Sequence, residues 1–89
     1  MPENKSLLTF PCSFPIKIMG INSDDLIAAV AAIVSIHSPD FDPENAITIA
    51  KSSKGNYISV TVTINATSQE QIDAIYLALN KHDLVKFTL

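Results

Sequence analysis

A short polar segment of this chain carries the residue types best suited to hold an anion. The loop from Ser52 to Asn56 contains Ser53, Lys54 and Gly55, and it lies between two segments with β-strand patterns, the second of which begins at Tyr57. A hydroxyl, an ammonium group and the oriented N–H groups of a glycine-containing loop can together bind an anion. The segment lacks a following helix and the spacing of a phosphate-binding P-loop. A hairpin turn is therefore the simpler interpretation, and Lys54 and Tyr57 are the residues that it would present if it binds a partner.

An acidic segment offers a second candidate chemistry. Asp40, Asp42 and Glu44 alternate along the chain as the oxygen ligands of a calcium loop do. The glycine and the distant bidentate glutamate of such a loop are missing. We therefore predict that the chain has no metal site and needs no cofactor.

The remaining reactive side chains have no partners at catalytic spacing. Cys12 lies between Pro11 and Ser13, without the cationic neighbour or helix N-terminus that stabilises a thiolate. His37 and His82 each fall near the expected C-terminus of a helix, where an imidazolium ion interacts favourably with the helix dipole. No acid–base pair or nucleophilic triad is recognisable. We predict that the protein is not an enzyme.

The composition limits the partners and the compartment. The chain has 89 residues, of which 47% are hydrophobic and 17% charged, and its net charge is −3. Its six basic residues are spread singly, which argues against nucleic acid. The single cysteine favours a reducing compartment, and neither a signal peptide nor an apolar span of about 18 residues is visible. These features predict a cytoplasmic protein that binds neither nucleic acid nor a membrane.

The most regular pattern of the sequence is an alternating segment over residues 57–65, which predicts the central β-strand. Successive side chains of a strand leave on opposite faces, so one set is expected in the core and the other on the open face. The core set is Ile58, Val60, Val62 and Ile64, and the other set is Tyr57, Ser59, Thr61, Thr63 and Asn65.

The other predicted elements flank this strand. We expect an N-terminal arm over residues 1–13 and a single domain over 14–89, with further strands at 14–19, 46–51 and 85–89 and a helix at 24–37. Gly20 is expected to end the first strand. A capping box of Thr67 and Glu70 is expected to start a second helix, which residues 80–83 close. In the last strand, Val85, Phe87 and Leu89 are expected to point inward.

This order of elements predicts an α+β protein with a ferredoxin-like βαββαβ sandwich, in which two helices cover one face of a four-stranded antiparallel sheet. The first and third strands are expected at the centre, and the second at an exposed edge with Ile47 and Ile49 inward. The open face is expected to display hydroxyls and lysines rather than the base-stacking aromatic residues of an RNA-binding sheet. The residues expected there are Lys17, Thr48, Ser59, Thr61, Thr63, Lys86 and Thr88.

Two surfaces of this fold are candidates for protein contacts. The exposed edge strand is guarded only by Lys51 and can pair with a strand of another chain. The first helix has alanines at 28, 29, 31 and 32, an unusually apolar outer face. We therefore expect a protein partner of unknown identity and consider a homodimer through the edge strand or the first helix.

The sequence resembles a YbeD-like family of small bacterial proteins. The resemblance extends from Leu7 to Leu89 and is carried by residues 10–11, 17–20, 52–57, 59–61 and 64–67, of which the SSKGNY segment is the most specific. It implies a ferredoxin-like fold close to the ACT regulatory domains of amino-acid metabolism. ACT domains bind small effectors at the turn between the first strand and the first helix, which corresponds here to residues 20–23. The resemblance thus implies that Gly20 and Asn22 line a ligand site.

Two hypotheses about function remain open. One is a non-catalytic regulatory or protein-interaction module that presents residues 53–57 and the edge strand. The other is an ACT-like sensor of an amino acid or metabolite that uses Gly20, Asn22 and backbone amides.

Overall fold

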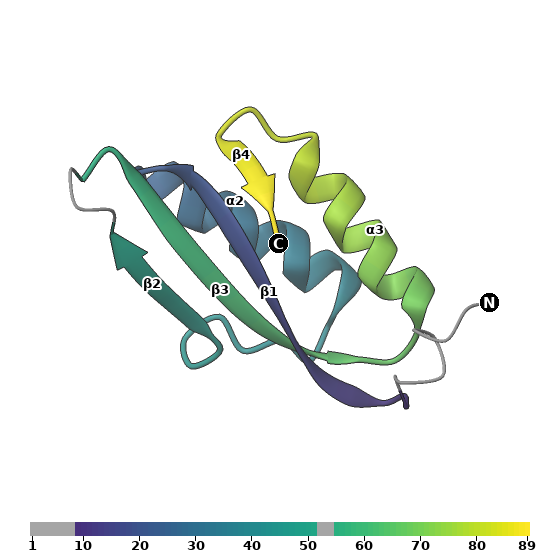
Figure 1. Cartoon of the computed structure of the whole chain (residues 1–89). Coiled ribbons are helices and arrows are strands. Elements are labelled where there is room, and N and C mark those ends of the chain that lie inside the picture. The colour runs from purple at the N-terminus through teal and green to yellow at the C-terminus, as the bar shows by residue number, and fades with distance from the viewer. Residues whose placement is uncertain (1–8, 52–54) are drawn as a thin grey trace.

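The order of secondary-structure elements confirms the predicted βαββαβ fold (Figure 1). A computed structural model describes residues 9–51 and 55–89 of the chain. Its elements are β1 (Cys12–Ile21), α2 (Asp24–His37), β2 (Ile47–Lys51), β3 (Tyr57–Ala66), α3 (Gln69–Asn80) and β4 (Val85–Thr88). Residues 1–8 of the predicted arm lie outside the described residues, and Cys12 and Ser13 belong to the sheet.

The four strands form one antiparallel sheet in the order β2-β3-β1-β4, with β1 and β3 at its centre as predicted. These two strands pair along their whole length, from Cys12 opposite Ala66 to Ile21 opposite Tyr57. The first strand is therefore longer than the alternation over 14–19 indicated. Gly20 lies inside it and does not end it, because hydrogen-bonded partners on both sides hold this part of the chain extended.

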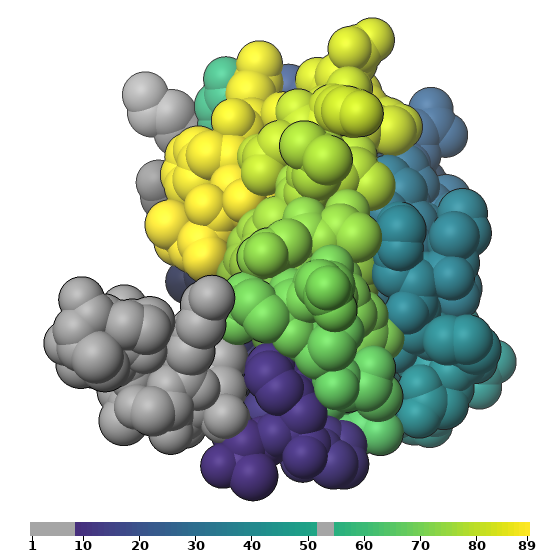
Figure 2. Space-filling view, turned by 90° about the vertical axis from the view of Figure 1, so that its right-hand side faces the viewer, coloured from purple at the N-terminus to yellow at the C-terminus, as the bar shows by residue number. Residues whose placement is uncertain are grey.

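Two helices cover one face of the sheet and leave the other face open (Figure 1). Figure 2, which looks at the molecule from the side, shows α3 between β4 and α2. The helices bury the predicted side of β3 completely: the exposed fraction is at most 2% for Ile58, Val60, Val62 and Ile64. Buried residues of the helices pack against this face: Leu26, Val30 and Val34 from α2, and Ile72, Ile75 and Leu79 from α3.

Serine side chains cap the N-termini of both helices. Ser23 accepts a hydrogen bond from the N–H of Asp25 at 3.0 Å, and α2 then runs over the range that the sequence predicted. The cap of α3 is Ser68, whose hydroxyl accepts from the N–H of Gln71 at 3.1 Å. The prediction of Thr67 as the cap was therefore wrong by one residue. Gln71, rather than Glu70, reaches back and accepts from the N–H of Thr67 at 2.7 Å.

The last strand contains a β-bulge that changes which side chains reach the core. Val85 lies opposite Gly20, but Phe87 lies opposite Met19, so Lys86 is an extra residue without a partner in the register. Because a bulge shifts the alternation by one residue, Val85 is the only one of the three residues expected to point inward that does so. The prediction that Phe87 and Leu89 point inward was wrong, and they are 48% and 65% exposed.

The bulge also moves Thr88 away from the open face. Thr88 lies opposite the buried Ile18 and accepts a hydrogen bond from the side-chain amide of Asn80 in α3 at 3.1 Å. At the other edge, Ile49 shares the helix-facing side of the sheet with Val60, as expected, although its side chain is 42% exposed. The main strand contacts of α3 are with β4 and β3.

Candidate interaction surface on the open sheet face

Apolar side chains gather at one corner of the open sheet face. Met19 lies opposite both Ser59 and Phe87, and Tyr57 lies opposite Ile21, which places these side chains on the face turned away from the helices. Leu89 joins them, because its backbone pairs with Lys17 through two hydrogen bonds of 2.8 and 3.5 Å. We call Met19, Ile21, Tyr57, Phe87 and Leu89 the apolar corner. Three of its members are strongly exposed: Tyr57 (43%), Phe87 (48%) and Leu89 (65%).

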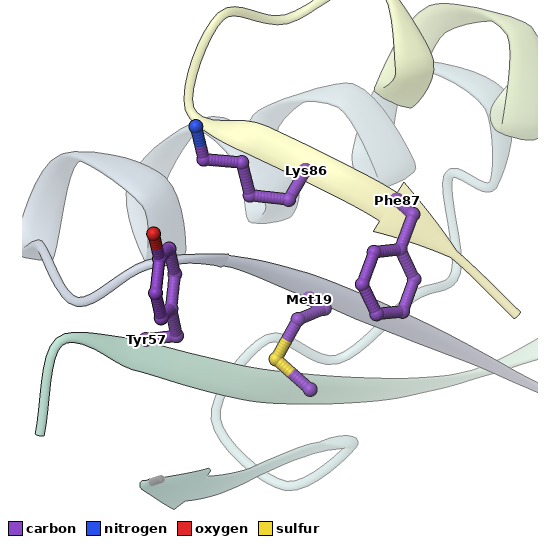
Figure 3. A pocket seen from close by; sticks show the side chains of 4 residues that line it. All are labelled: Met19, Tyr57, Lys86 and Phe87. Atoms are coloured by element: carbon purple, nitrogen blue, oxygen red, sulfur yellow. The ribbon is translucent and has the colours of Figure 1, made fainter. Parts of the chain in front are cut away.

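A hollow of about 390 Å³ lies within this corner. Its lining consists of Met19, Tyr57, Phe87 and Lys86, and Figure 3 shows how the four side chains extend from β1, β3 and β4 around it. The bulge in β4 puts Lys86 beside Phe87 on this face, where regular alternation would separate them. The hollow thus combines two aromatic rings, a thioether and one ammonium group.

The turn before α2 and the β2–β3 hairpin meet at the end of the sheet that carries the apolar corner. The side-chain amide of Asn22 donates to the carbonyl oxygen of Gly55 at 2.7 Å. The backbone N–H of Asn22 donates to the carbonyl oxygen of Asn56 at 3.0 Å. Gly55 adopts a positive φ of 76°, which fits the hairpin interpretation. The structure therefore brings together Asn22, Gly55, Asn56 and Tyr57, which the sequence had assigned to two separate sites.

The two hydrogen bonds of Asn22 join parts of the protein to each other, and the space around Gly20 is likewise occupied by the protein itself. A Cβ atom added there would lie 2.5 Å from the main-chain oxygen of Leu84 and 2.8 Å from Cδ2 of Leu26. The space beside Gly20 is thus filled by the protein's own atoms, and the expectation that Gly20 lines a ligand site stays a prediction. The predicted site residues Ser53 and Lys54 lie outside the described residues.

The acidic segment 40–44 is engaged in local hydrogen bonds. Asp42 accepts from the N–H of Glu44 at 3.0 Å and from the side-chain amide of Asn45 at 2.7 Å. The hydrogen bond from Asn45, followed by that from Glu44, holds the pKa of the Asp42 carboxyl below its usual range. Asp40 accepts from the hydroxyl of Ser38 at 3.3 Å. Over residues 9–51 and 55–89, histidine, cysteine and acidic side chains form no group with the geometry of a metal site.

The two histidines stabilise turns and helix ends. His37 occupies the last turn of α2, as predicted. His82 follows α3, and its Nδ1 accepts a hydrogen bond from the N–H of Leu84 at 3.2 Å. This contact lies in the turn that leads into β4.

Comparison with known proteins identifies the family. A sequence model of the family described as "Protein of unknown function (DUF493)" matches residues 5–89. This chain belongs to the DUF493 family. A UPF0250 protein from Janthinobacterium sp. (strain Marseille) is 45% identical over 89 residues, which cover 100% of this chain and 97% of the relative. A UPF0250 protein from Neisseria gonorrhoeae is 48% identical over 88 residues, covering 98% of this chain and 96% of the relative.

Solved structures confirm the ACT-like fold of this DUF493 chain. The solution structure of protein HP0495 from H. pylori matches with a TM-score of 0.72 at 14% identity, covering 100% of this chain and 94% of that one. The ACT domain from the GTP pyrophosphokinase of Chlorobium tepidum matches with a TM-score of 0.61 at 18% identity, covering 86% of this chain and 94% of that one. Together with the relatives, these matches confirm the resemblance to the YbeD-like family.

Sequence reasoning missed most of the apolar corner. Tyr57 was expected on the open face and lies there, but Phe87 was assigned to the core because the bulge leaves no mark in the alternation of residues 85–89. Met19 could have been found, because it is out of phase with the buried Ile16 and Ile18. The candidate surface therefore emerges only when the register between β1 and β4 is known.

Proposed function

We propose that this DUF493 protein is a non-catalytic regulatory module of the cytoplasm that acts by binding another protein through the apolar corner. The observation that carries the proposal is that Tyr57, Phe87 and Leu89 stand exposed together on a sheet face that the helices do not cover. Contiguous exposed apolar side chains on a small domain are typical of interaction sites. Aromatic side chains are also over-represented among the residues that dominate binding energy.

The chemistry of the hollow supports binding rather than catalysis. Its described lining is three apolar or aromatic side chains and the ammonium group of Lys86, without a carboxylate, an imidazole or a thiol. Such a lining can hold an apolar group and orient a negative charge. The location in the cytoplasm is supported by the single cysteine and by the lack, in the described parts of the chain, of a helix long and apolar enough to cross a membrane.

The edge of β2 supports self-association as part of the same proposal. The N–H of Thr63 donates to the carbonyl of Ala46, which makes these two residues a hydrogen-bonded pair. By the register, Thr48 and Ala50 also stand in hydrogen-bonded pairs with β3. Hydrogen-bonded and non-hydrogen-bonded pairs alternate in an antiparallel ladder, so the backbone groups of Ile47, Ile49 and Lys51 point away from β3. These groups can pair with the same strand of a second copy.

Two observations favour a second candidate function, a small-molecule sensor. The fold is similar to an ACT domain, and the hollow of about 390 Å³ falls within the size range of small-ligand pockets. The sensor would hold an apolar metabolite with a negative group near Lys86. Asn22 and Gly55 bond to each other, so in this candidate they shape the site from behind rather than contact the ligand.

A photocrosslinking experiment tests the interaction module. A benzophenone amino acid replaces Phe87 in one variant and Leu77, an exposed apolar residue of α3, in the control. We expect irradiated bacterial cells to yield a protein adduct from position 87 and not from position 77. The adduct identifies a candidate, and the purified candidate should bind wild-type protein and lose at least tenfold in affinity with Phe87→Ser. Equal adducts from both positions, or unchanged affinity, would contradict the proposal.

A thermal-shift screen distinguishes the sensor from the module. A metabolite at about 100 times its dissociation constant stabilises the folded state by about 2.7 kcal/mol. For a domain of this size, that raises the melting temperature by on the order of 10 °C. A shift that Phe87→Ser abolishes would favour the sensor, whereas a flat screen beside a confirmed protein adduct favours the interaction module.

A further inference from the structure

Charge is distributed unevenly between the sheet and the rest of the molecule. The acidic residues of the described ranges all lie in helices, turns and loops: Asp24, Asp25, Asp40, Asp42, Glu44, Glu70, Asp73 and Asp83. The charged residues of the four strands are all lysines, at positions 17, 51 and 86. The sheet of this acidic protein is therefore cationic.

The register assigns the three lysines to the two faces of the sheet. Lys17 lies opposite Thr61 and pairs with Leu89, which puts it on the open face beside the apolar corner. Lys86 lines the hollow itself. Lys51 lies opposite the buried Ile58 and so belongs to the helix-facing side. Within the described residues, the charged strand residues on the open face are both lysines.

This distribution gives the open face a definite electrostatic preference. The net charge of the chain is −3, so its other surfaces repel an acidic partner while the open face attracts it. A local field of opposite sign orients a charged partner as it approaches, and it suppresses encounters with the wrong face. The attraction acts over a Debye length, about 8 Å at physiological ionic strength.

We propose that the open face binds an acidic–apolar protein segment, in which one large apolar side chain enters the hollow and a neighbouring carboxylate pairs with Lys86. The inference rests on the proposed interaction module and specifies the chemistry of its partner. The hollow, with its two aromatic rings and thioether, suits an aliphatic or aromatic anchor, and Lys17 can pair with a second carboxylate further along the segment. The hydroxyl-rich remainder of the face, with Thr48, Thr61 and Thr63, offers hydrogen bonds to the segment's backbone.

Two other occupants fit the same surface less well. Nucleic acid is held mainly by cations that neutralise several phosphates, and the described face offers only Lys17 and Lys86 for this. A second copy bound face to face would bring the lysines of both open faces together, and like charges placed opposite each other oppose association. A protein segment with carboxylates satisfies both the apolar and the cationic part of the surface.

Selection from a random library of displayed 12-residue peptides tests the inference. Four immobilised proteins are compared: wild type, Lys86→Glu, Lys51→Glu and Phe87→Ser. Lys51→Glu makes the same change of charge in a strand but on the other side of the sheet, so it is the matched control. Melting curves of all four confirm that each is folded. A fluorescent single-stranded RNA of 15 nucleotides is titrated against wild type and Lys86→Glu in parallel.

We expect peptides selected on wild type and on Lys51→Glu to carry Asp or Glu within about four residues of Leu, Ile, Met or Phe. On Lys86→Glu the preferred charge should reverse to Lys or Arg, and the wild-type peptides should bind at least tenfold more weakly. Phe87→Ser should bind neither the peptides selected on wild type nor those selected on Lys86→Glu.

Three results would overturn the inference. Peptides that need Phe87 but show no acidic bias would refute the charge pairing and leave the interaction module intact. The absence of any peptide that depends on Phe87 would refute both the inference and the apolar corner as a peptide-binding surface. RNA binding that Lys86→Glu abolishes, without peptide enrichment, would assign the face to nucleic acid.

Discussion

Gly20 is the residue whose role changes most between sequence and structure. The absence of a side chain there lets β1 approach the main-chain oxygen of Leu84, which accepts a hydrogen bond from the N–H of Ile21 at 3.1 Å. The residue thus holds the start of β4 against β1. Its importance is to the fold, and ligand exclusion alone cannot explain the effect of replacing it.

Gly20→Ala is expected to destabilise the protein because the new methyl group must displace Leu84 and Leu26. Overpacking of this kind costs about 1–3 kcal/mol, which corresponds to a loss of on the order of 10 °C in melting temperature. Gly55→Ala is the comparison, since it has free space but strains a backbone with φ of 76°, and should cost about 1 kcal/mol. Melting curves followed by circular dichroism measure both. A Gly20→Ala protein as stable as wild type would contradict this role.

Tyr76 connects α3 to the end of the chain, and its removal should have a pH-dependent effect. Its hydroxyl donates to the main-chain oxygen of Leu89 at 2.9 Å, and burial raises the pKa of the phenol. A raised pKa means that the folded state favours the protonated phenol, so its contribution is complete below the ordinary value of about 10 and is lost as the pH rises through the folded pKa.

Tyr76→Phe should therefore lower the free energy of unfolding by about 0.5–1.5 kcal/mol at pH 7, through loss of the hydrogen bond. The difference between wild type and variant should shrink as the pH rises through the raised folded pKa of Tyr76, because the ionised phenol can no longer donate. Urea unfolding over a series of pH values from 7 upward measures it. A difference that stays constant would show that the hydrogen bond does not depend on the protonation of Tyr76.

Among the elements, the edge strand β2 permits a test of self-association that spares the fold. The N–H of Ile49 points away from β3, whereas that of Thr48 points toward it. Ile49→Pro removes a donor only from the free edge and should convert a dimer to a monomer in sedimentation equilibrium. Thr48→Pro removes a donor of the internal ladder and should lower the melting temperature instead. An Ile49→Pro protein that still dimerises would exclude pairing through this edge.

The bulged strand β4 supports a prediction about deletion. Lys86 has no partner in the register, so its removal leaves Val85 opposite Gly20, Phe87 opposite Met19 and Thr88 opposite Ile18. We expect the deletion variant to melt within a few degrees of wild type while losing the cation of the hollow. Deletion of Thr61 from the regular β3 is the control and should abolish folding, because it reverses the faces of one half of the strand. Unfolding of the Lys86 deletion would show that the bulge itself is required.

An element could be predicted from sequence when the contacts that fix its faces and limits are made by residues close to it in the chain. The faces of β3 follow from the local alternation of Ile58, Val60, Val62 and Ile64, and the limits of α2 follow from Ser23 and the loop after His37. The faces of β4 depend on its pairing with β1 at Met19 and Gly20, about 65 residues earlier, which leaves no local pattern. The composition of the candidate surface was therefore only partly predictable.

Taken as a whole, the molecule separates its layers by charge as well as by secondary structure. The helices and loops carry the described acids, and the sheet carries lysines beside exposed aromatic rings. Sequence composition could not reveal this, because a net charge of −3 averages over both layers. The helix layer buries the core and can be understood from periodicity. On the open face, the alternation of the strands already predicted Lys17 and Lys86, whereas the place of Phe87 depends on the register.

The bulge at Lys86 has a consequence for how this fold can diverge. A side chain in the regular ladder is constrained by the neighbours opposite it, but an unpaired residue on an open face can be exchanged at little cost to stability. Descendants of one scaffold could therefore acquire different binding preferences by changing a single codon at this position. Recognition could evolve there faster than the architecture that supports it.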